Sequence, residues 1–412
     1  MANTSQSVIV VGAGIAGLST SFHLADKGVR KVLLLDKGRV GDGSSSRSGA
    51  INTMMMATEG ASRARGITFD IFERFDKILE NYDFHQVGCL NLLDSQQFER
   101  ARRLHPMHRR AGARFQVLRR REVEERFPDL RIGGDEYGVL DLRGGYSEPD
   151  RYLPALSAKV REMGVELREG VSINDFLIEA GRVTGVRTRE SGTLRADSVV
   201  CTVNAWANSL MAQAGQPLPV RNFVHERWVT MPLEHPPRLP ATNDDAKGVY
   251  YRPTEDDRVL LGTGAHEAVQ IERPGPDFRL TELVPDPRSL PFIQEAVRDR
   301  LPLIQGVGID YHRVGLVSYA LDFLPNIGPV EALPGLYLAV TFNSGGFGYH
   351  PVAGFLLAEY MVDGQTSIDA SEFSPDRFLD FDTQSYLAKT VTHGQMIRDH
   401  EARTALPVRK RH

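Results

Sequence analysis

The sequence predicts an α/β protein that begins with a strand of a parallel sheet. Three observations near the N-terminus support this fold. Residues 8–11 form a run of β-branched side chains, which suits a strand buried on both faces. Three glycines follow within residues 12–17, and a second apolar run, residues 31–35, ends at the acidic Asp36. This order of strand, glycine turn, helix, strand and acid is typical of a βαβ unit that binds a dinucleotide.

The glycines and the helix after them predict a phosphate site. Gly12 permits a tight turn, Gly14 lets the backbone approach a pyrophosphate, and Gly17 lets the helix pack on the strand. A helix over residues 15–27 directs its first N–H groups and its dipole at the phosphates, while Asp36 accepts bonds from a ribose hydroxyl. The predicted cofactor-binding residues of this unit are Gly12, Ala13, Gly14, Ile15, Ala16, Gly17, Asp36 and Lys37.

A stretch of small residues after this unit favours FAD over NAD. Residues 41–50 are Gly-Asp-Gly-Ser-Ser-Ser-Arg-Ser-Gly-Ala. They suit an extended path from a pyrophosphate to a flavin ring, and the alternative is a flexible Ser/Gly linker. Arg47 and the apolar residues 51–56 do not suit a solvated linker. The predicted contacts here are Ser44, Ser45, Ser46, Arg47, Ser48 and Gly49.

The composition excludes several other classes of protein. The 412 residues carry 49 Lys and Arg against 53 Asp and Glu, a net charge of -4, which gives no attraction for nucleic acid or an anionic membrane. Cys89 and Cys201 are the two cysteines, and neither lies in a metal-ligand pattern. The sequence has neither a signal-like segment nor an apolar run that would span a bilayer. We therefore expect a reducing, cytoplasmic location and no metal site.

Two segments far from the N-terminus extend the pattern. Residues 322–329 lead to a strand at 335–340 and to Asn-Ser-Gly-Gly-Phe-Gly at 343–348, before another predicted helix. Residues 199–206 give a strand, a small-residue turn and a tryptophan. Together with the N-terminal unit, these motifs resemble the FAD-dependent D-amino acid oxidase superfamily, which includes glycine oxidase and sarcosine oxidase. The resemblance covers residues 7–365.

This resemblance implies two interleaved domains. An FAD-binding, Rossmann-like domain of the GR2 type takes residues 1–84, 147–220 and 322–412. An α+β substrate-binding domain, built on a mostly antiparallel sheet, takes residues 85–146 and 221–321. The hairpin Val-Tyr-Tyr-Arg-Pro that begins at Val249 resembles part of that substrate domain.

The resemblance also implies further cofactor contacts. In the family the glycine loop before the last helix passes beside the flavin pyrimidine, where its N–H groups stabilise an anionic reduced ring. The alternative is a loop that merely turns a strand into a helix, with Pro351 in the first turn of that helix. Asn204 stands where the family usually has glycine. The predicted contacts are Val171, Asn204, Trp206, Gly345, Gly346, Phe347 and Gly348.

In this superfamily flavin N5 takes a hydride from the carbon beside an amine nitrogen, and the imine then hydrolyses. The resemblance therefore implies an FAD-dependent oxidase or dehydrogenase of a small amine or amino acid, with oxygen or another electron acceptor. Val317 stands where relatives have a carboxylate-binding arginine or an FAD-linking cysteine, so we expect non-covalent FAD. Gly348 and Leu260 stand where sarcosine oxidases have a carboxylate-binding and an oxygen-promoting lysine.

Another cation would then hold a substrate carboxylate, if the substrate has one. Arg252 is the first candidate, and the alternative is an ion pair with a structural acid. The weaker candidates are Arg47, Arg65, Arg313 and His225. Tyrosines and a histidine are candidates for an aromatic pocket over the flavin, or else for the core: Tyr250, Tyr251, Tyr319 and His350. The predicted catalytic residues are Arg252, Tyr251, Tyr319 and His350.

Two other functions stay open. The first is a flavin-dependent 2-hydroxy acid or alcohol oxidoreductase, which stays open because the family's carboxylate-binding residues are missing here. The second is an FAD-binding subunit of a larger complex. Two features suggest it: nine arginines and no acid fall within residues 100–121, and the tail, residues 385–412, lies outside the resemblance. We expect the arginines on a solvated helix pair rather than on a nucleic-acid surface, and the tail either on a neighbouring subunit of a homo-oligomer or mobile.

Local signals predict two more helices. Residues 148–163 have apolar residues on one face, as in an amphipathic helix. Asp70 and Glu73 have the spacing of a capping box, which predicts a helix from there to about Asn81.

Overall fold

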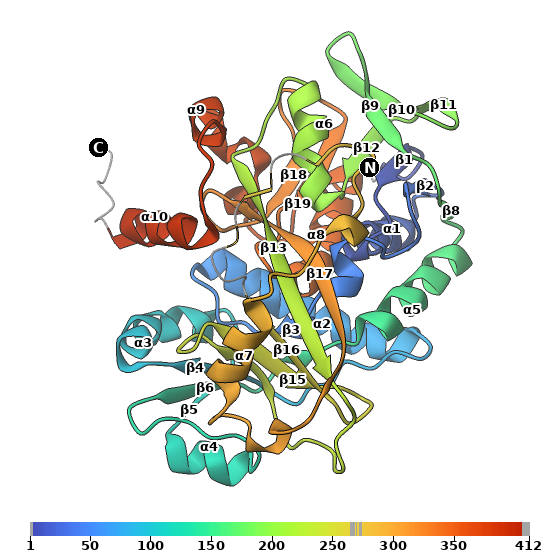
Figure 1. Cartoon of the computed structure of the whole chain (residues 1–412). Coiled ribbons are helices and arrows are strands. Elements are labelled where there is room, and N and C mark those ends of the chain that lie inside the picture. The colour runs from blue at the N-terminus through green and yellow to red at the C-terminus, as the bar shows by residue number, and fades with distance from the viewer. Residues whose placement is uncertain (1–2, 264–267, 269, 272–273, 406–412) are drawn as a thin grey trace.

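The structure is a computed structural model that describes residues 3–263, 268, 270–271 and 274–405. Two large sheets organise it, as expected for an α/β protein. Figure 1 shows them in two halves of the molecule, with the long strands β13 and β17 running side by side between the halves.

The first sheet has the strand order β18-β19-β12-β1-β2-β8. Its strands are parallel except for β18, which is antiparallel to β19. The β-branched β1 lies in its middle and is almost fully buried, as a central parallel strand requires. The strands are β1 (Ser7–Val11), β2 (Lys31–Leu35), β8 (Glu166–Arg168), β12 (Ser198–Cys201), β18 (Asn326–Pro329) and β19 (Leu336–Val340).

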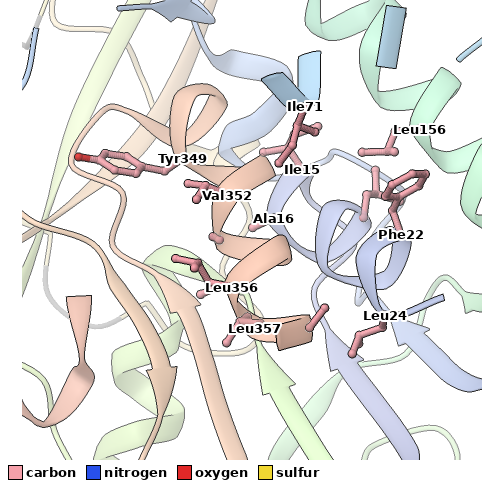
Figure 2. Packing of buried hydrophobic residues seen from close by; sticks show 14 of the residues in the cluster. Ile15, Ala16, Phe22, Leu24, Ile71, Leu156, Tyr349, Val352, Leu356 and Leu357 are labelled. Atoms are coloured by element: carbon pink, nitrogen blue, oxygen red, sulfur yellow. The ribbon is translucent and has the colours of Figure 1, made fainter. Parts of the chain in front are cut away.

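Helices α1 (Ile15–Asp26) and α8 (Gly346–Val362) cross in close contact beside this sheet. Their backbones touch because Gly354 has no side chain: a Cβ there would lie 2.7 Å from the carbonyl carbon of Ser19. Figure 2 shows the apolar side chains of both helices meeting Ile71 and Leu156, which come from α2 (Glu59–Ile78) and α5 (Pro149–Glu162). Helix α1, which begins within the glycine motif at residues 12–17, therefore packs in the core.

The second sheet has the strand order β17-β13-β16-β15-β14-β4-β6-β5. Among the described residues its pairs are antiparallel except for β14 with β4. The strands are β4 (Cys89–Leu93), β5 (Phe115–Leu118), β6 (Tyr137–Asp141), β13 (Val220–Thr230), β14 (Ala241–Asp244), β15 (Val249–Pro253), β16 (Val259–Thr263) and β17 (Ile309–Ala320).

Smaller elements surround the two sheets. The short strands are β3 (Ile51–Asn52), β7 (Gly145–Tyr146), β9 (Ile173–Glu179), β10 (Arg182–Thr188) and β11 (Gly192–Arg195). The remaining α-helices are α3 (Ser95–Arg110), α4 (Arg120–Arg126), α6 (Ala207–Gln213), α7 (Ser289–Val297), α9 (Thr383–Leu387) and α10 (His393–Ala405). The 3-10 segments are Ser44–Arg47, Asn204–Trp206, Leu280–Glu282, Pro302–Ile304, Ser371–Phe373 and Pro375–Phe378.

The predicted start of a helix at Asp70 is wrong. Helix α2 begins at Glu59, and its N-cap is Thr58, whose side chain accepts the Ala61 N–H. Asp70 lies inside this helix and pairs with Arg143 on the surface. Its capping-box spacing with Glu73 is only the spacing of two exposed residues on one helix face.

Two expectations near the C-terminus also change. Pro351 lies inside α8, beyond its first turn, because the helix already begins at Gly346. The described part of the tail contacts its own chain: Met396 of α10 is buried beside Phe223 and Tyr319. Residues 406–412 of the tail lie outside the described residues.

Candidate functional site

One cavity of about 470 Å³ is lined by residues from both large sheets. Its lining includes the glycine turn, Asp36, the serine-rich turn and the loop before α8. The predicted cofactor residues that line it are Gly12, Gly14, Ile15, Ala16, Asp36, Lys37, Ser44, Ser45, Arg47, Ser48, Gly49, Val171, Asn204, Trp206, Gly346 and Phe347. The structure therefore brings together three segments that lie far apart in the sequence.

The glycine turn has no room for side chains. Gly12 has φ +103, a conformation that favours glycine. A Cβ at Gly17 would lie 1.8 Å from the carbonyl oxygen of Gly12, so Gly17 lets α1 approach β1 without lining the cavity. A Cβ at Gly14 would lie 3.1 Å from Oγ of Ser45. The N-terminus of α1 is thus bare backbone where it faces the cavity.

Asp36 organises the same end of the cavity. Its carboxylate accepts the N–H groups of Ala13 and Gly38, each at 2.7 Å, and its backbone carbonyl accepts the Val171 N–H at 2.8 Å. Burial raises the pKa of Asp36. Ala13 therefore acts through its N–H rather than as a lining residue. The free lone pairs of the Asp36 carboxylate remain for a ribose hydroxyl.

Lys37 and Trp206 form the wall beyond Asp36. The Lys37 ammonium lies 4.2 Å from the Trp206 ring centroid and donates to the carbonyl oxygens of Pro276 and Phe278, both at 2.8 Å. Burial lowers the pKa of Lys37 to about 8. Lys37 lines the cavity and also links its own segment to Trp206 and to residues 276–278.

The serine-rich turn forms a short 3-10 helix along the cavity rather than a linker. Oγ of Ser45 accepts the N–H of Ile15 at 3.0 Å, and Oγ of Ser44 donates to the carbonyl of Leu316 at 2.6 Å. Arg47 donates to the carbonyls of Asp42 and Gly43. Ser46 faces away from the cavity, and its carbonyl accepts a bond from Arg227 at 2.9 Å.

Asn204 replaces a glycine without losing the glycine conformation. Its φ is +39, in the left-handed region that asparagine tolerates better than most residues. Its Oδ1 accepts the N–H of Thr341 at 2.9 Å, and Thr341 has φ +63, which is strained for a β-branched residue. The asparagine side chain therefore links the loop at Asn204 to the loop at Thr341 through a hydrogen bond that glycine could not make.

The loop before α8 gives the cavity a second helix N-terminus. Gly346 and Phe347 line the cavity, whereas Gly345 and Gly348 do not. Cβ atoms at those two glycines would lie 2.6 Å and 0.9 Å from the guanidinium of Arg65, which comes from α2. These two predicted contacts therefore make room for an arginine behind the loop.

Tyr250 and Tyr251 point to opposite faces of strand β15, because side chains alternate along a strand. Tyr250 lines the cavity and packs on Gly262 and Gly49, whose Cβ atoms would lie 2.1 Å and 2.6 Å from its ring. Tyr251 lies in the core of the other face, with its hydroxyl 3.4 Å from Asp244. Tyr250, and not the predicted catalytic residue Tyr251, therefore faces the cavity.

Tyr319 lies one layer behind the cavity. Its hydroxyl is 3.0 Å from Nε2 of His225, and His225 lines the cavity. Burial lowers the pKa of His225 to about 3, so its imidazole is neutral at neutral pH. Tyr319 therefore orients His225 and does not itself face the cavity.

Arg252 is fully buried and serves an ion pair. Its Nη1 and Nη2 donate to the two carboxylate oxygens of Glu148 at 2.7 Å and 2.9 Å, and its Nε donates to the carbonyl of Gly49 at 2.7 Å. It is absent from the cavity lining. Arg252 was the first candidate for a carboxylate anchor. The structure instead shows the alternative, an ion pair with the structural acid Glu148.

His350 lies in the core rather than over the cavity. Its ring is fully buried against Phe72, Tyr152 and Phe347. Neither ring nitrogen has a hydrogen-bond partner among the described residues, and burial lowers its pKa far below the ordinary value. Of the weaker cation candidates, Arg47 and His225 line the cavity, whereas Arg313 is exposed on β17.

Several lining residues had no sequence signal of their own. They are Asn243, Ser318, Asn343 and Ser344, together with Val317, which was noted only for the residue it replaces. Asn343 accepts the N–H of Ala320 and donates to the carbonyl of Thr341, each at 2.9 Å. Isolated asparagines and serines are common in any loop, so only the packing of β14, β17 and this loop identifies them.

These residues fit a bound FAD. The bare N-terminus of α1 suits a pyrophosphate, and Asp36 suits a ribose. Gly346 and Phe347, at the N-terminus of α8, offer N–H groups to the polar edge of a flavin at the other end. Each of these features lines the same cavity.

A protein family described as "DAO: FAD dependent oxidoreductase" matches residues 7–360. Glycine oxidase of Pseudomonas putida is 26% identical, over 90% of this chain and 99% of that protein. The 4-methylaminobutanoate oxidase (formaldehyde-forming) of Paenarthrobacter nicotinovorans is 25% identical, over 91% of this chain but 46% of that protein. The chain thus spans about half the length of this relative.

Solved structures have the same fold. L-proline dehydrogenase from P. horikoshii superposes with a TM-score of 0.83, at 25% identity, over 91% of this chain and 98% of that one. Among the residues that the structure describes, none of the helices is both long and apolar enough to pass through a membrane.

Proposed function

The chain belongs to the DAO family of FAD-dependent oxidoreductases, and on that premise we propose that it oxidises the C–N bond of a small amine or amino acid. The observation that carries this proposal is one cavity whose lining includes both the glycine turn before α1 and the side chains Tyr250, His225 and Asn243. When bound, FAD supplies the acceptor for a hydride from the carbon beside the nitrogen.

The lining residues Tyr250, His225 and Asn243 suit an uncharged amine. A hydride leaves such a carbon only when the nitrogen has a free lone pair, so the ammonium form of the substrate must lose its proton. His225 is neutral because burial lowers its pKa to about 3, and it therefore adds no positive charge there. The ring of Tyr250 and the amide of Asn243 orient the substrate and exclude water.

The curated relatives act on different C–N substrates, and for this chain the substrate is part of the proposal. Anaerobic addition of small secondary amines and amino acids to the purified holoprotein is expected to bleach the flavin absorbance. Bleaching by 2-hydroxy acids, with none by any amine, would instead indicate a C–OH oxidoreductase.

We propose oxygen or another small acceptor for the second half of the reaction, without a partner subunit. Leu260 is buried in β16 and is not among the residues that line the cavity, so it supplies no charge there to promote the reaction with oxygen. Mixing the reduced protein with air and timing the return of the flavin absorbance measures the reaction with oxygen. Turnover by the purified chain alone would rule out a partner that supplies catalysis, whereas its absence with every acceptor would favour one.

A further inference from the structure

One face of the paired strands β13 and β17 is shared between the cavity and the C-terminal part of the chain. Arg221, Phe223 and His225 alternate along β13, so their side chains point to the same face. On β17, Val317 lies opposite Phe223. Tyr319 lies opposite Arg221, so both β17 residues belong to that face too. His225 and Val317 line the cavity, whereas Phe223 and Tyr319 are buried in a cluster with α10.

The C-terminal segment, residues 386–396, is fixed to this face at two points. The Arg221 guanidinium donates to the carbonyl oxygen of Tyr386, and its Cζ lies 4.0 Å from the ring centroid of the same tyrosine. Further along, the N–H of His393 donates to the carbonyl oxygen of Ala268 at 2.9 Å. The segment lies beyond the part of the chain that matches the family, so its contacts with β13 are an addition to the family's fold.

His393, the first residue of α10, brings the C-terminal segment next to His225. The centroids of the two imidazole rings are 5.9 Å apart, and the rings meet edge to face at an interplanar angle of 78°. The centroid of the His393 ring is also 4.9 Å from that of Tyr319 and 5.0 Å from that of Phe223. His393 is 6% exposed. It therefore fills the space behind a ring that faces the cavity.

The state of the His225 ring depends on its contact with Tyr319. Nε2 of His225 lies 3.0 Å from the Tyr319 hydroxyl, and burial keeps that phenol neutral by raising its pKa. The hydrogen bond at one ring nitrogen decides whether the other nitrogen donates or accepts. Such a bond weakens steeply when distance or angle changes, so the two rings must keep their relative position. His393 contacts both rings and thereby fixes that position.

We propose that His393 is a positioning residue for His225 and that the C-terminal segment is therefore part of the reaction site. The inference rests on the proposed function and deepens it: a residue outside the family match decides which tautomer His225 presents to a substrate in the cavity. His393 acts through the shape of its ring, because its contacts with His225, Tyr319 and Phe223 are ring contacts. Another flat ring at this position is therefore expected to replace it.

The first measurement observes His225 itself. The holoprotein is prepared with isotope-labelled histidine for nitrogen NMR, and the signals that disappear in His225→Gln belong to His225. We expect one protonated and one unprotonated nitrogen in the native protein, as in a single neutral tautomer. In His393→Ala the two signals are expected to shift toward each other, because the bond to Tyr319 loses its support and the tautomers exchange. His393→Phe is expected to restore the native signals.

The second measurement connects this state to the reaction. Rapid mixing of the oxidised holoprotein with sarcosine, glycine or L-proline gives the limiting rate of flavin reduction. We expect His393→Ala to lower that rate about 10- to 100-fold, since a small displacement of a positioned group has an effect of this size. His393→Phe is expected to recover most of it. The matched control is Arg398→Met, because Arg398 is exposed on the same helix and donates to Gln395. It is expected to leave both measurements unchanged.

Unchanged His225 signals in His393→Ala would overturn the proposal. Altered signals with an unchanged rate of flavin reduction would also overturn it, because the C-terminal segment would then not belong to the reaction site. The same loss in His393→Phe as in His393→Ala would overturn the role of ring shape. If His393→Ala does not fold, His393→Gln, which fills more of the space without a ring, replaces it in both measurements.

A failure of the proposed function gives a different result. If no amine reduces the flavin of the native protein, the proposed oxidation of a C–N bond is wrong. The nitrogen signals of the same variants then still decide whether His393 positions His225.

Discussion

The hydroxyl oxygen of Ser45 accepts the backbone N–H of Ile15, the first residue of α1, at 3.0 Å. This bond joins the serine-rich turn to the glycine turn at the point where a helix N-terminus faces the cavity. It keeps a polar oxygen where a phosphate oxygen of the dinucleotide is expected. We therefore predict that the two turns form one phosphate site, although each looks separate in the sequence.

Replacing this serine tests the site. Ser45→Ala is expected to raise the Kd for FAD about three- to tenfold, because a hydrogen bond near a charged phosphate is lost. Flavin fluorescence during reconstitution of the apoprotein measures that Kd. Ser191→Ala, on the surface, is the control. Equal affinities in both variants would contradict a phosphate site at Ser45.

The contact between Gly17 and Gly12 predicts a severe packing defect. Gly17→Ala places a Cβ 1.8 Å from the Gly12 carbonyl, so α1 must move away from β1. We expect a loss of about 3 kcal/mol or more in the free energy of unfolding and a protein purified without flavin. Gly134→Ala is the control, since nothing lies within 4 Å of its Cβ. Chemical denaturation and the flavin-to-protein absorbance ratio measure both effects.

The ion pair of Arg252 with Glu148 predicts a loss of stability rather than of substrate affinity. Arg252→Met leaves the Glu148 carboxylate without its two bonds, and we expect a loss of about 3–5 kcal/mol in the free energy of unfolding. Urea denaturation measures it. A stable Arg252→Met variant with a weakened affinity for carboxylates would instead make Arg252 the substrate anchor.

The buried His23 and the half-buried His225 predict a pH dependence of stability. Burial lowers the pKa of His225 and of His23 to about 3, against about 6.5 in an unfolded chain. Between these values the unfolded chain binds more protons, so stability is present above pH 6.5 and is lost as the pH falls toward 3.

Each histidine contributes a slope of up to about 1.4 kcal/mol per pH unit over that range. Denaturation in urea at several pH values measures the slope. His23→Gln and His225→Gln are expected to flatten it, whereas His235→Gln on the surface is expected to leave it unchanged. An equal slope in all three variants would show that other groups cause the acid instability.

The lining of the cavity predicts non-covalent FAD. Neither Cys89 nor Cys201 is among the lining residues, and Val317 occupies the wall there. Acid precipitation of the holoprotein is expected to leave all of the flavin in the supernatant, where its absorbance measures it. Flavin in the pellet would point to the lining histidine, His225, and loss of that flavin in His225→Gln would identify the linkage.

The parts of the fold that follow from local sequence could be predicted. The segment from Gly12 to Asp36 depends on a turn, a helix and two strands that are neighbours in the chain, and the strand bounds 31–35 agree with β2. The family resemblance is confirmed over residues 7–360. Asn204 was recognised as a departure from glycine, and its positive φ explains why asparagine replaces it.

The rest depends on packing between distant segments. Whether Tyr250 or Tyr251 faces the cavity depends on which face of β15 meets the FAD domain, and a strand pattern alone does not fix that. The capping-box spacing at Asp70 was misleading because a longer helix had already begun at Thr58 and Glu59. Arg252 and Arg65 differ only in what surrounds them: Glu148 reaches the first, and no acid among the described residues pairs with the second.

The strand order of the first sheet also limits when the protein can mature during its synthesis. Strand β1 is made first, but its neighbour β12 follows almost two hundred residues later, and β19 later still. At about 5–20 residues per second, the ribosome takes tens of seconds to complete the sheet. Until α8 emerges, the glycine turn has no partner helix to pack against. FAD can therefore enter its full site only after α8 has been synthesised.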